Sequence, residues 1–263
     1  MTDVFGFHEG DSPLLISVPH AGTRVPGNVR GRMTAEGAAI PDTDWHVSEL
    51  YSFAHELGAG LLVANYSRYV VDLNRPSTDE ALYEGQVATG LCPGQTFAGA
   101  PIYRDAGGVD VDGRVDVYWQ PYHAKLRTQL DALREAFGYA LLWDAHSIAS
   151  VVPRLFDGEL PALNVGTDDG RSCAAGIGEA VAEAAAGSGY SHVVNGRFRG
   201  GFITRHYGDP AGGVHAVQLE IAQRVYMDEA SGVYDVHKAE RLRATLRHML
   251  EALLITAEEK LKV

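Results

Sequence analysis

The sequence predicts an α/β fold with a mostly parallel or mixed sheet, and three observations lead to this prediction. Short apolar runs alternate along the chain with segments of helical periodicity. Several of these runs are almost wholly apolar, which is typical of strands that helices cover on both faces. The 263 residues suffice for one large α/β domain and contain no repeat or low-complexity linker. We therefore expect residues 1–263 to form a single domain.

Seven apolar runs are candidate strands. A short, continuous apolar run that turn residues bound is consistent with a buried strand. The runs are Leu14–Val18, Gly60–Asn65, Tyr69–Leu73, Tyr139–Trp143, Ala162–Val165, His192–Asn195 and His215–Ile221.

Four segments between these runs are predicted helices. In Asp44–Leu57, apolar side chains recur on one face, and Gly58 can end the helix. Tyr118–Phe137 carries one stripe of Leu and Phe, and Val236–Lys262 repeats Leu and Met at helical spacing. The fourth segment, Arg171–Ala186, is rich in Ala. Alternation of these helices with the strands supports the α/β prediction.

The stretch around residues 77–116 differs from the rest of the chain. It is rich in Gly, Pro, Asp and Thr and includes the sequence CPGQTFAGAPIYRDAGGVDVDGR. It is too long for an ordinary connection between two elements of a compact domain. We therefore predict that it is a functional loop or lid.

The overall charge excludes some classes of partner. Lys and Arg number 22 against 34 Asp and Glu, which gives a formal net charge of −12, whereas a phosphate-backbone partner requires clustered Lys and Arg. No apolar run approaches the length of a membrane span, and the first residues, MTDVFGFHEGDSP, do not resemble a signal peptide. We expect a cytoplasmic protein that binds neither nucleic acid nor membrane. The sequence carries no prediction of oligomeric state.

Two histidines each close an apolar run. LLISVPH ends at His20, and YALLWDAHS carries His146. The carboxyl end of a core strand is where open α/β sheets bind ligands, and imidazole is the commonest metal ligand among side chains. A hydrogen-bonded structural role is the better interpretation of either histidine alone, but the pair favours a metal site. Neither Cys92 nor Cys173 belongs to a CxxC motif, so no thiolate zinc site is predicted.

A catalytic zinc site keeps three protein ligands, so a third is needed. The sequence DTDWH offers Asp42, Asp44 and His46. Asp44 is the favoured ligand and His46 is its rival, whereas Asp42 could simply cap a helix. Asp144, two residues before His146, could orient a ligand.

Glu220 interrupts the apolar strand HAVQLEIA. A buried carboxylate without a partner is costly. One interpretation is a general base with a raised pKa that takes a proton from water activated by a metal. The other, of equal weight, is a carboxylate that faces solvent or pairs with an Arg.

Arginines in two segments could bind an acidic ligand, because the planar guanidinium binds carboxylates bidentately. SRYVVDLNRP contains Arg68, Asn74 and Arg75, and the glycine-rich GRFRGGFITRHYGDP contains Arg199 and Arg205. For each arginine alone, a solvated or ion-paired role is the more common one. A local positive pocket would nevertheless suit a small acidic substrate.

Five blocks in order, SVPHAG, DTDWHVSELY, ANYSRYVVDLNRP, WDAHS and VQLEI, resemble the N-formylglutamate amidohydrolases, also called N-formylglutamate deformylases. The resemblance runs from about Leu14 to Ile221, and SRYVVDLNRP is its most specific block. That family is similar in fold to the zinc carboxypeptidases, of the phosphorylase/hydrolase-like fold, and to the succinylglutamate desuccinylase and aspartoacylase group. The resemblance therefore implies a three-layer α/β/α domain with a mixed, mostly parallel sheet.

The resemblance also implies a metal site and a base. By position, His20 and His146 match the two histidine ligands of the wider group, and Glu220 in QLEI matches its base. That wider group uses a compact HxxE motif, whereas PHAGT has no Glu three residues after His20. Asp44 is therefore assigned as the acidic ligand. The implied cofactor is Zn²⁺, although such ligands also suit other divalent metals.

The substrate implied by the resemblance is a small dicarboxylate. Asn74 and Arg75 match the pair that holds the substrate carboxylate, and Arg205 or Arg68 would hold the second carboxylate. The implied reaction is metal-dependent hydrolysis of N-formyl-L-glutamate to formate and L-glutamate, in histidine degradation. Two alternatives are an amidohydrolase for another N-acyl amino acid and a non-catalytic protein that binds an acidic amino acid on the same fold.

Overall fold

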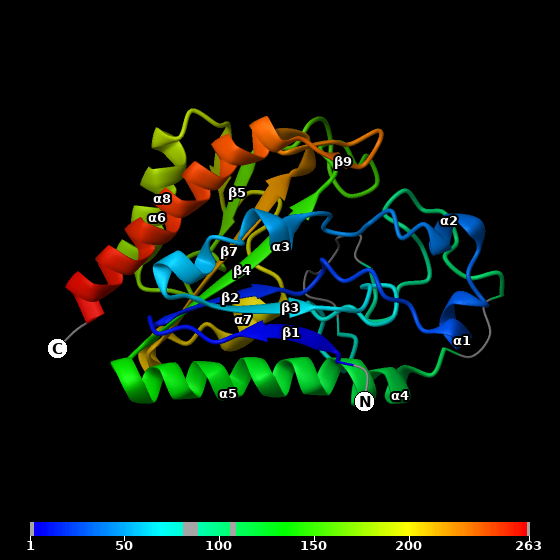
Figure 1. Ribbon diagram of the computed structural model, residues 1–263, viewed down its shortest axis with the longest axis horizontal. Coiled ribbons are helices and arrows are strands. Elements are labelled where there is room, and N and C mark those ends of the chain that lie inside the picture. Colours follow the sequence, from blue (N-terminus) through cyan, green and yellow to red (C-terminus); the bar gives the residue numbers. More distant parts are fainter. Residues whose placement is uncertain (1–2, 81–88, 106–108, 262–263) are drawn as a thin grey trace.

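The computed structural model of the protein describes residues 3–80, 89–105 and 109–261 (Figure 1). Among these residues the main sheet contains seven strands: β1 (Phe5–His8), β2 (Leu14–Val18), β3 (Gly60–Ala64), β4 (Ala140–Ile148), β5 (Leu163–Gly166), β6 (His192–Val194) and β7 (Val214–Ala222). A separate ribbon pairs β8 (Met227–Asp228) with β9 (Val233–Tyr234).

The three long helices are α5 (Gln120–Phe137), α6 (Ala175–Gly187) and α8 (Val236–Leu261). The short helices are α1 (Gly27–Arg30), α2 (Ala35–Ala38), α3 (Val47–Leu50), α4 (Val111–Arg114) and α7 (Phe202–Tyr207). Single turns of other helix types are η1 (Ala54–Leu57), η2 (Val115–Trp119), η3 (Pro210–Gly212) and η4 (Gln223–Val225). None of the helices in the described part of the chain is both long enough and apolar enough to span a membrane.

The strand order of the sheet is β1-β3-β2-β4-β7-β5-β6. The four central strands β3, β2, β4 and β7 run parallel, whereas β1 lies antiparallel to β3 and β5 lies antiparallel to β7. The central strands therefore end at the same edge of the sheet. That edge is where open α/β sheets place their ligands.

Helices cover both faces of the sheet and produce three layers (Figure 1). The helices α3, α6 and α8 pack over one face, and α5 and α7 pack over the other. Along β4, Leu141, Trp143 and Ala145 face the first core, and Ala140 and Leu142 face the second. The predicted α/β/α architecture with a mixed, mostly parallel sheet is confirmed.

The predicted strand Tyr69–Leu73 is wrong, because the segment forms turns. Its apolar side chains are buried. Its backbone hydrogen bonds, however, are local or irregular and do not form a strand ladder. Arg75 N donates to Asp72 O at 3.2 Å, and Asp72 N donates to Leu91 O at 2.7 Å. Asp72 Oδ1 also accepts from Asn74 N at 2.8 Å. An apolar run indicates that the segment is buried, but it does not distinguish a buried strand from a buried turn.

The predicted helix Asp44–Leu57 is only partly correct, since α3 and η1 occupy its middle and end. His46 lies at φ +61° just before α3, a left-handed conformation that cannot belong to an α-helix. Asp44 therefore lies in the loop that precedes the helix. Gly58, at φ +63°, follows η1 and ends it as predicted.

The remaining predicted elements are present, β2 with the predicted ends and the others with shifted ends. The other three predicted helices correspond to α5, α6 and α8, although residue 262 lies outside the described residues. The strand predicted at Tyr139–Trp143 continues to Ile148 as β4. β1 was not predicted, because four half-exposed residues with a glycine carry little apolar signal.

The segment around residues 77–116 has no strand of the sheet in its described parts and enters α4 at Val111. Residues 81–88 and 106–108 lie outside the described residues, so part of the predicted loop does too. Phe97 from this segment reaches the pocket described below. A role as a lid stays a prediction.

Candidate active site

The carboxyl ends of β2, β4 and β7 bring three predicted site residues together. His20 follows β2 within one turn, His146 lies in β4, and Glu220 is its direct neighbour in the parallel register of β7. Because side chains alternate along a strand, Asp144 shares one face of β4 with His146, and Gln218 shares one face of β7 with Glu220. Polar side chains thus replace apolar ones at the carboxyl end of this face.

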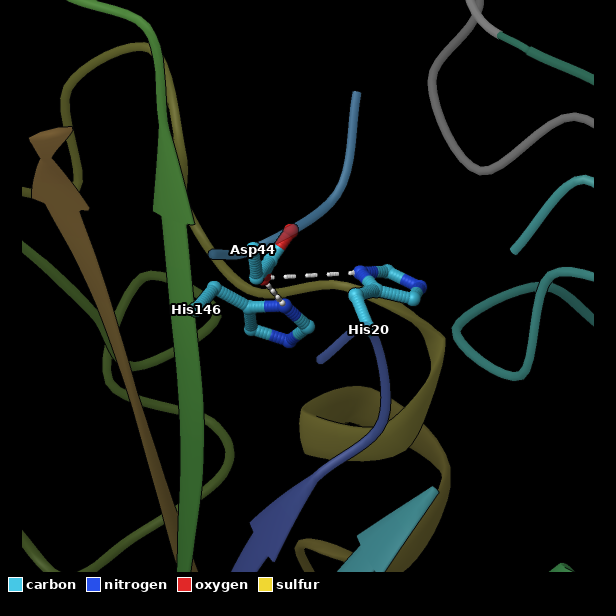
Figure 2. Close-up of side chains that lie close together, drawn as sticks. All are labelled: His20, Asp44 and His146. Atoms are coloured by element: carbon cyan, nitrogen blue, oxygen red, sulfur yellow. Dashed lines mark hydrogen bonds and ion pairs between the residues drawn. The ribbon is translucent and has the colours of Figure 1, made fainter. Parts of the chain in front are cut away.

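His20, Asp44 and His146 form a buried group from three separate segments (Figure 2). Asp44 Oδ2 lies 3.2 Å from His146 Nδ1 and 3.8 Å from His20 Nδ1. One ligand atom from each residue lies within 4.8 Å of the others. The three side chains therefore have the composition and convergence of a metal site with two imidazoles and one carboxylate.

Two atoms of this group have no hydrogen-bond partner among the described residues. In the described part of the chain, His20 Nδ1 and Asp44 Oδ1 are buried and make no hydrogen bond. A buried polar atom without a partner costs about 1–3 kcal/mol. A cation bound between the side chains would satisfy both atoms, so the residues fit a divalent metal ion.

Carboxylates hold the far side of each imidazole. Asp72 Oδ1 lies 2.7 Å from His20 Nε2, and Asp144 Oδ1 lies 3.1 Å from His146 Nε2. At His20 the acceptor at Nε2 fixes the ring and leaves Nδ1 for a metal, as is usual for metal-binding histidines. At His146 the contact with Asp144 is an ion pair. Both rings therefore direct Nδ1 toward Asp44.

Burial and the surrounding charges shift the pKa values of the three side chains in different directions: that of His146 is raised, and those of His20 and Asp44 are lowered. Burial alone would lower the pKa of His146, but Asp144 and Asp44 outweigh it and hold that pKa well above its usual value. Burial and the nearby Arg68 guanidinium lower the pKa of His20 against the opposing effect of two carboxylates. Burial opposes ionisation of Asp44, yet its hydrogen bond to His146 and the other cations keep its pKa low. Asp44 is thus ready to act as an anionic ligand.

A pocket opens beside this group, and six of the predicted site residues line it: His20, Arg68, Asn74, Arg75, His146 and Glu220. Glu220 is 8% exposed, and no described residue donates a hydrogen bond to its carboxylate. Burial, partly offset by His146, raises the pKa of Glu220 to about 8. A carboxyl group with a pKa near neutrality can both accept and return a proton.

Asn74 contacts the His20–Asp44–His146 group as well as lining the pocket. Its Nδ2 lies 3.0 Å from His146 Nε2, and its Oδ1 accepts from the backbone of Ile203 at 2.8 Å. Gly201 also packs against it, since a Cβ there would lie 2.2 Å from Asn74 Nδ2. The α7 segment therefore holds the amide in place beside His146.

Arg68 and Arg75, two of the arginines predicted to bind the substrate, make different contacts. Arg68 NH2 lies 2.6 Å from Asp72 Oδ2, so Arg68 supports the carboxylate that holds His20. Arg75 lines the pocket and donates through Nε to Thr89 O at 2.8 Å. Both arginines therefore lie at the pocket, although Asp72 already neutralises the first.

The structure does not bring Arg205 to the pocket. Its Nε donates to Gly200 O at 2.8 Å, and its NH2 lies 3.2 Å from Asp168 Oδ1. These contacts direct the side chain to the loop after β5, so it does not line the pocket among the described residues.

Neither rival of Asp44 belongs to the group. Asp42 accepts a hydrogen bond from Tyr69 OH at 2.5 Å and another from Phe97 N at 2.7 Å. The ring of His46 lies 3.0 Å from Gly232 O through Nε2, away from the other histidines. Asp42 instead fixes the segment that carries Phe97.

Two residues that line the pocket are not among the predicted site residues. Ser147 lines the pocket, and its backbone N–H donates to Asp44 Oδ2 at 3.0 Å. Arg197 also lines it. The signal for Arg197 was present in GRFRGG, but three arginines in one glycine-rich segment are indistinguishable without the course of the backbone.

The fold and the site together define a class of protein: an α/β/α enzyme whose pocket contains a buried His–Asp–His group able to hold a metal ion. Comparison with known proteins identifies the family within this class. The family model of the N-formylglutamate amidohydrolases matches residues 12–227. The chain belongs to the N-formylglutamate amidohydrolase family.

Two curated relatives extend over nearly the whole chain. N-formylglutamate deformylase of Pseudomonas putida is 49% identical over 265 residues, and that of Pseudomonas aeruginosa is 51% identical over 265 residues. Each alignment covers 99% of both sequences. The hydrolase class of the enzyme follows from this similarity.

Solved structures agree with the fold. The crystal structure of N-formylglutamate amidohydrolase from Ralstonia eutropha JMP134 superposes with a TM-score of 0.82 at 25% identity, covering 98% of this chain and 99% of that one. A gene product of Agrobacterium tumefaciens shares the fold at a TM-score of 0.69 and 19% identity, covering 95% of this chain and 96% of that one.

Proposed function

We propose that this protein hydrolyses N-formyl-L-glutamate to formate and L-glutamate with a divalent metal ion bound by His20, Asp44 and His146. The observation that carries the proposal is the buried group of these three side chains at a pocket that also contains arginines. The names of the two Pseudomonas relatives supply the substrate. Two imidazoles and one carboxylate make Zn²⁺ the first candidate.

The metal would occupy the space where His20 Nδ1, His146 Nδ1 and Asp44 converge. When bound, a divalent ion polarises a carbonyl and makes a water molecule more acidic. Asp72 and Asp144 hold the two rings from behind. These carboxylates hold both imidazoles in the orientation that a ligand requires.

Glu220 would move the proton. Its position beside His146 places the carboxylate at the pocket, where it takes a proton from the attacking water. The water oxygen then bonds to the formyl carbon, the C–N bond breaks, and the proton passes from Glu220 to the leaving amine nitrogen. A pKa raised toward neutrality by burial suits both transfers.

The arginines would bind the dicarboxylate. The net charge of −12 opposes the approach of an anion, so local cations must reverse the potential inside the pocket. Arg75 is held by Thr89 and directly follows Asn74, which contacts His146. It is therefore placed to bind the substrate carboxylate nearest to the scissile amide.

The proposal also includes four further expectations. They are one domain over residues 1–263, a functional loop around residues 77–116, a cytoplasmic location and a place in histidine degradation. The rivals of the proposed function are hydrolysis of another N-acyl amino acid and non-catalytic binding of an acidic amino acid.

Two measurements test the proposal. Metal analysis of the purified protein should find about one divalent ion per chain, and formate release should be faster from N-formyl-L-glutamate than from N-formylaspartate or the N-acetyl and N-succinyl analogues of glutamate. Faster hydrolysis of an analogue would favour the first rival. Absence of stoichiometric metal, together with no hydrolysis after addition of Zn²⁺, would favour the second.

A further inference from the structure

Asp44 lies in the loop before α3, so no strand or helix fixes the position of its carboxylate. Its backbone N–H donates to His20 O at 3.1 Å, and Ser147 N donates to its Oδ2 at 3.0 Å. The other oxygen, Oδ1, is buried and has no hydrogen-bond partner among the described residues. The contacts that hold the loop therefore decide where this carboxylate is presented (Figure 2).

The backbone carbonyls on both sides of Asp44 are held by one short segment. Gln223 Nε2 donates to Thr43 O at 3.1 Å, and Tyr226 OH donates to Trp45 O at 2.8 Å. Both side chains are buried, and they belong to η4 and to the residue that follows it, directly after β7. The loop is thus fixed to this segment immediately before and immediately after Asp44.

The same two side chains also contact Ser147, which follows His146 in β4. Tyr226 OH lies 2.8 Å from Ser147 Oγ, and Gln223 Nε2 lies 3.4 Å from it. The single hydrogen of the Tyr226 hydroxyl goes to Trp45 O, because a carbonyl oxygen can only accept. The Ser147 hydroxyl therefore donates to Tyr226 and accepts from Gln223. A continuous chain of hydrogen bonds thus joins β4 to the loop.

We propose that Tyr226, together with Gln223 and Ser147, positions Asp44 for the metal ion and thereby sets the metal affinity of the site. This inference rests on the proposed function, because it takes Asp44 as a metal ligand. The three residues act through Asp44, since a loop that is already held in place loses little conformational freedom when an ion binds. Loss of such a supporting partner typically lowers metal affinity roughly 10- to 100-fold.

The test removes the Tyr226 hydroxyl and measures metal binding directly. Tyr226→Phe preserves the ring, which packs in the core with α8. Titration of the metal-free variant with Zn²⁺ alone, in competition with a chromophoric chelator, should give a Kd roughly 10- to 100-fold above that of the wild type. A native circular dichroism spectrum of the metal-free variant at the same temperature ensures that the Kd describes the folded protein.

Tyr51→Phe is the matched control. The Tyr51 hydroxyl is buried in the same core and accepts a hydrogen bond from Trp143 Nε1 at 2.8 Å. In the described part of the chain it makes no hydrogen bond to Ser147 or to the loop that carries Asp44. Its loss should lower the free energy of unfolding but leave the Kd for Zn²⁺ unchanged. If the Tyr226 hydroxyl were merely structural, the two variants would have the same Kd.

Ser147→Ala tests the same chain of hydrogen bonds from its other end. It keeps the backbone N–H that binds Asp44 and removes only the Oγ that Tyr226 and Gln223 contact, so it should also raise the Kd. The double variant with Tyr226→Phe should raise the Kd by less than the product of the two single effects, because both substitutions break one connected network. If Tyr226→Phe does not fold, Ser147→Ala decides the question by its own Kd.

The outcomes separate this inference from the proposed function. A Kd for Zn²⁺ in Tyr226→Phe equal to that of the wild type would overturn the inference, as would equal increases in Tyr226→Phe and Tyr51→Phe. Failure of the wild-type protein to bind Zn²⁺ would contradict the proposed metal site and the inference with it. A wild-type protein that binds Zn²⁺ but releases no formate from N-formyl-L-glutamate would contradict the proposed reaction alone.

Discussion

Glu220 shows how strand register changes the chemistry of a single side chain. The same carboxylate in a solvated position would have an ordinary pKa, but β7 buries it beside His146, and burial raises its pKa to about 8. From the sequence, a general base and a solvated or ion-paired carboxylate are equally consistent with Glu220. Burial and the position at the pocket favour the base, since no arginine in the described part of the chain forms an ion pair with Glu220.

Glu220→Gln removes the proton acceptor while preserving size. We expect kcat to fall about 10²- to 10⁴-fold, the usual contribution of general acid–base catalysis. The metal content should stay at the wild-type level, because Glu220 is not part of the His20–Asp44–His146 group. Steady-state kinetics with metal analysis of the same sample measures both. Wild-type kcat in a metal-loaded Glu220→Gln protein would exclude Glu220 as the base.

The residues of the site could be predicted from the sequence only where the local pattern of residues fixes their position in the fold. His20 and His146 close apolar runs, so their arrival at one edge of the sheet followed from the fold class. Arg197 and Arg205 lie in one glycine-rich segment, and only the hydrogen bonds that Asn195 and Gly201 make to distant residues decide which of them faces the pocket. Those hydrogen bonds connect residues far apart in the sequence, and no local pattern reports them.

At the scale of elements, α5 supports the site through a buried histidine. His123 Nε2 donates to Leu73 O at 2.9 Å, and its Nδ1 accepts from Tyr207 OH at 2.9 Å. Leu73 directly precedes Asn74, so this contact joins α5 and α7 to the turn that carries part of the site. Burial lowers the pKa of His123 to about 3.

This histidine should make the stability of the protein sensitive to acid. The folded state keeps His123 neutral, whereas the unfolded state protonates it below its ordinary pKa of about 6.5. Its contribution is therefore constant above pH 6.5 and is lost as the pH falls from there toward 3. Between pH 7 and pH 5 the loss is about 2 kcal/mol.

Urea unfolding at pH 7 and pH 5 measures this effect as a difference between proteins. The wild type should lose about 2 kcal/mol more than His123→Gln between the two pH values, and the exposed His248→Gln on α8 should behave like the wild type. Equal losses in the wild type and His123→Gln would show that His123 is not the group responsible.

The helices and strands also show which elements an apolar sequence pattern can predict and which it cannot. The long helices and the buried strands were predictable because their apolar periodicity extends over enough residues. Tyr69–Leu73 was predicted as a strand because it is apolar and buried, but Asp72 closes a turn with Asn74 and Arg75. In this segment a polar side chain, rather than apolar content, decided the backbone conformation.

At the scale of the whole molecule, the proposed metal would join segments that the sequence separates widely. His20 follows β2, Asp44 belongs to the loop before α3, and His146 belongs to β4. A ligand that binds only the folded state stabilises it by RT ln(1 + [L]/Kd). At a free metal concentration of 1,000 times Kd, the gain is about 4 kcal/mol.

Removal of the metal by a chelator should therefore lower the melting temperature by roughly 8–16 °C, and Zn²⁺ should restore it. Asp44→Asn should abolish most of this shift. His46→Asn is the matched control, because His46 lies near Asp44 in the sequence but contacts Gly232; it should keep the full shift. A melting temperature that is the same with and without metal in the wild type would contradict the proposed site.

The pairing of His146 with Glu220 across β4 and β7 has a consequence for how activity arises during folding. A slip of one residue between these strands would turn one of the two side chains to the opposite face of the sheet. The proposed ligand and the proposed base are thus aligned by the hydrogen bonds that pair β4 with β7 in the middle of the sheet. We therefore expect enzymatic activity to return during refolding at the same time as the native pairing of β4 with β7. A folding intermediate in which these strands are paired out of register should have no measurable turnover.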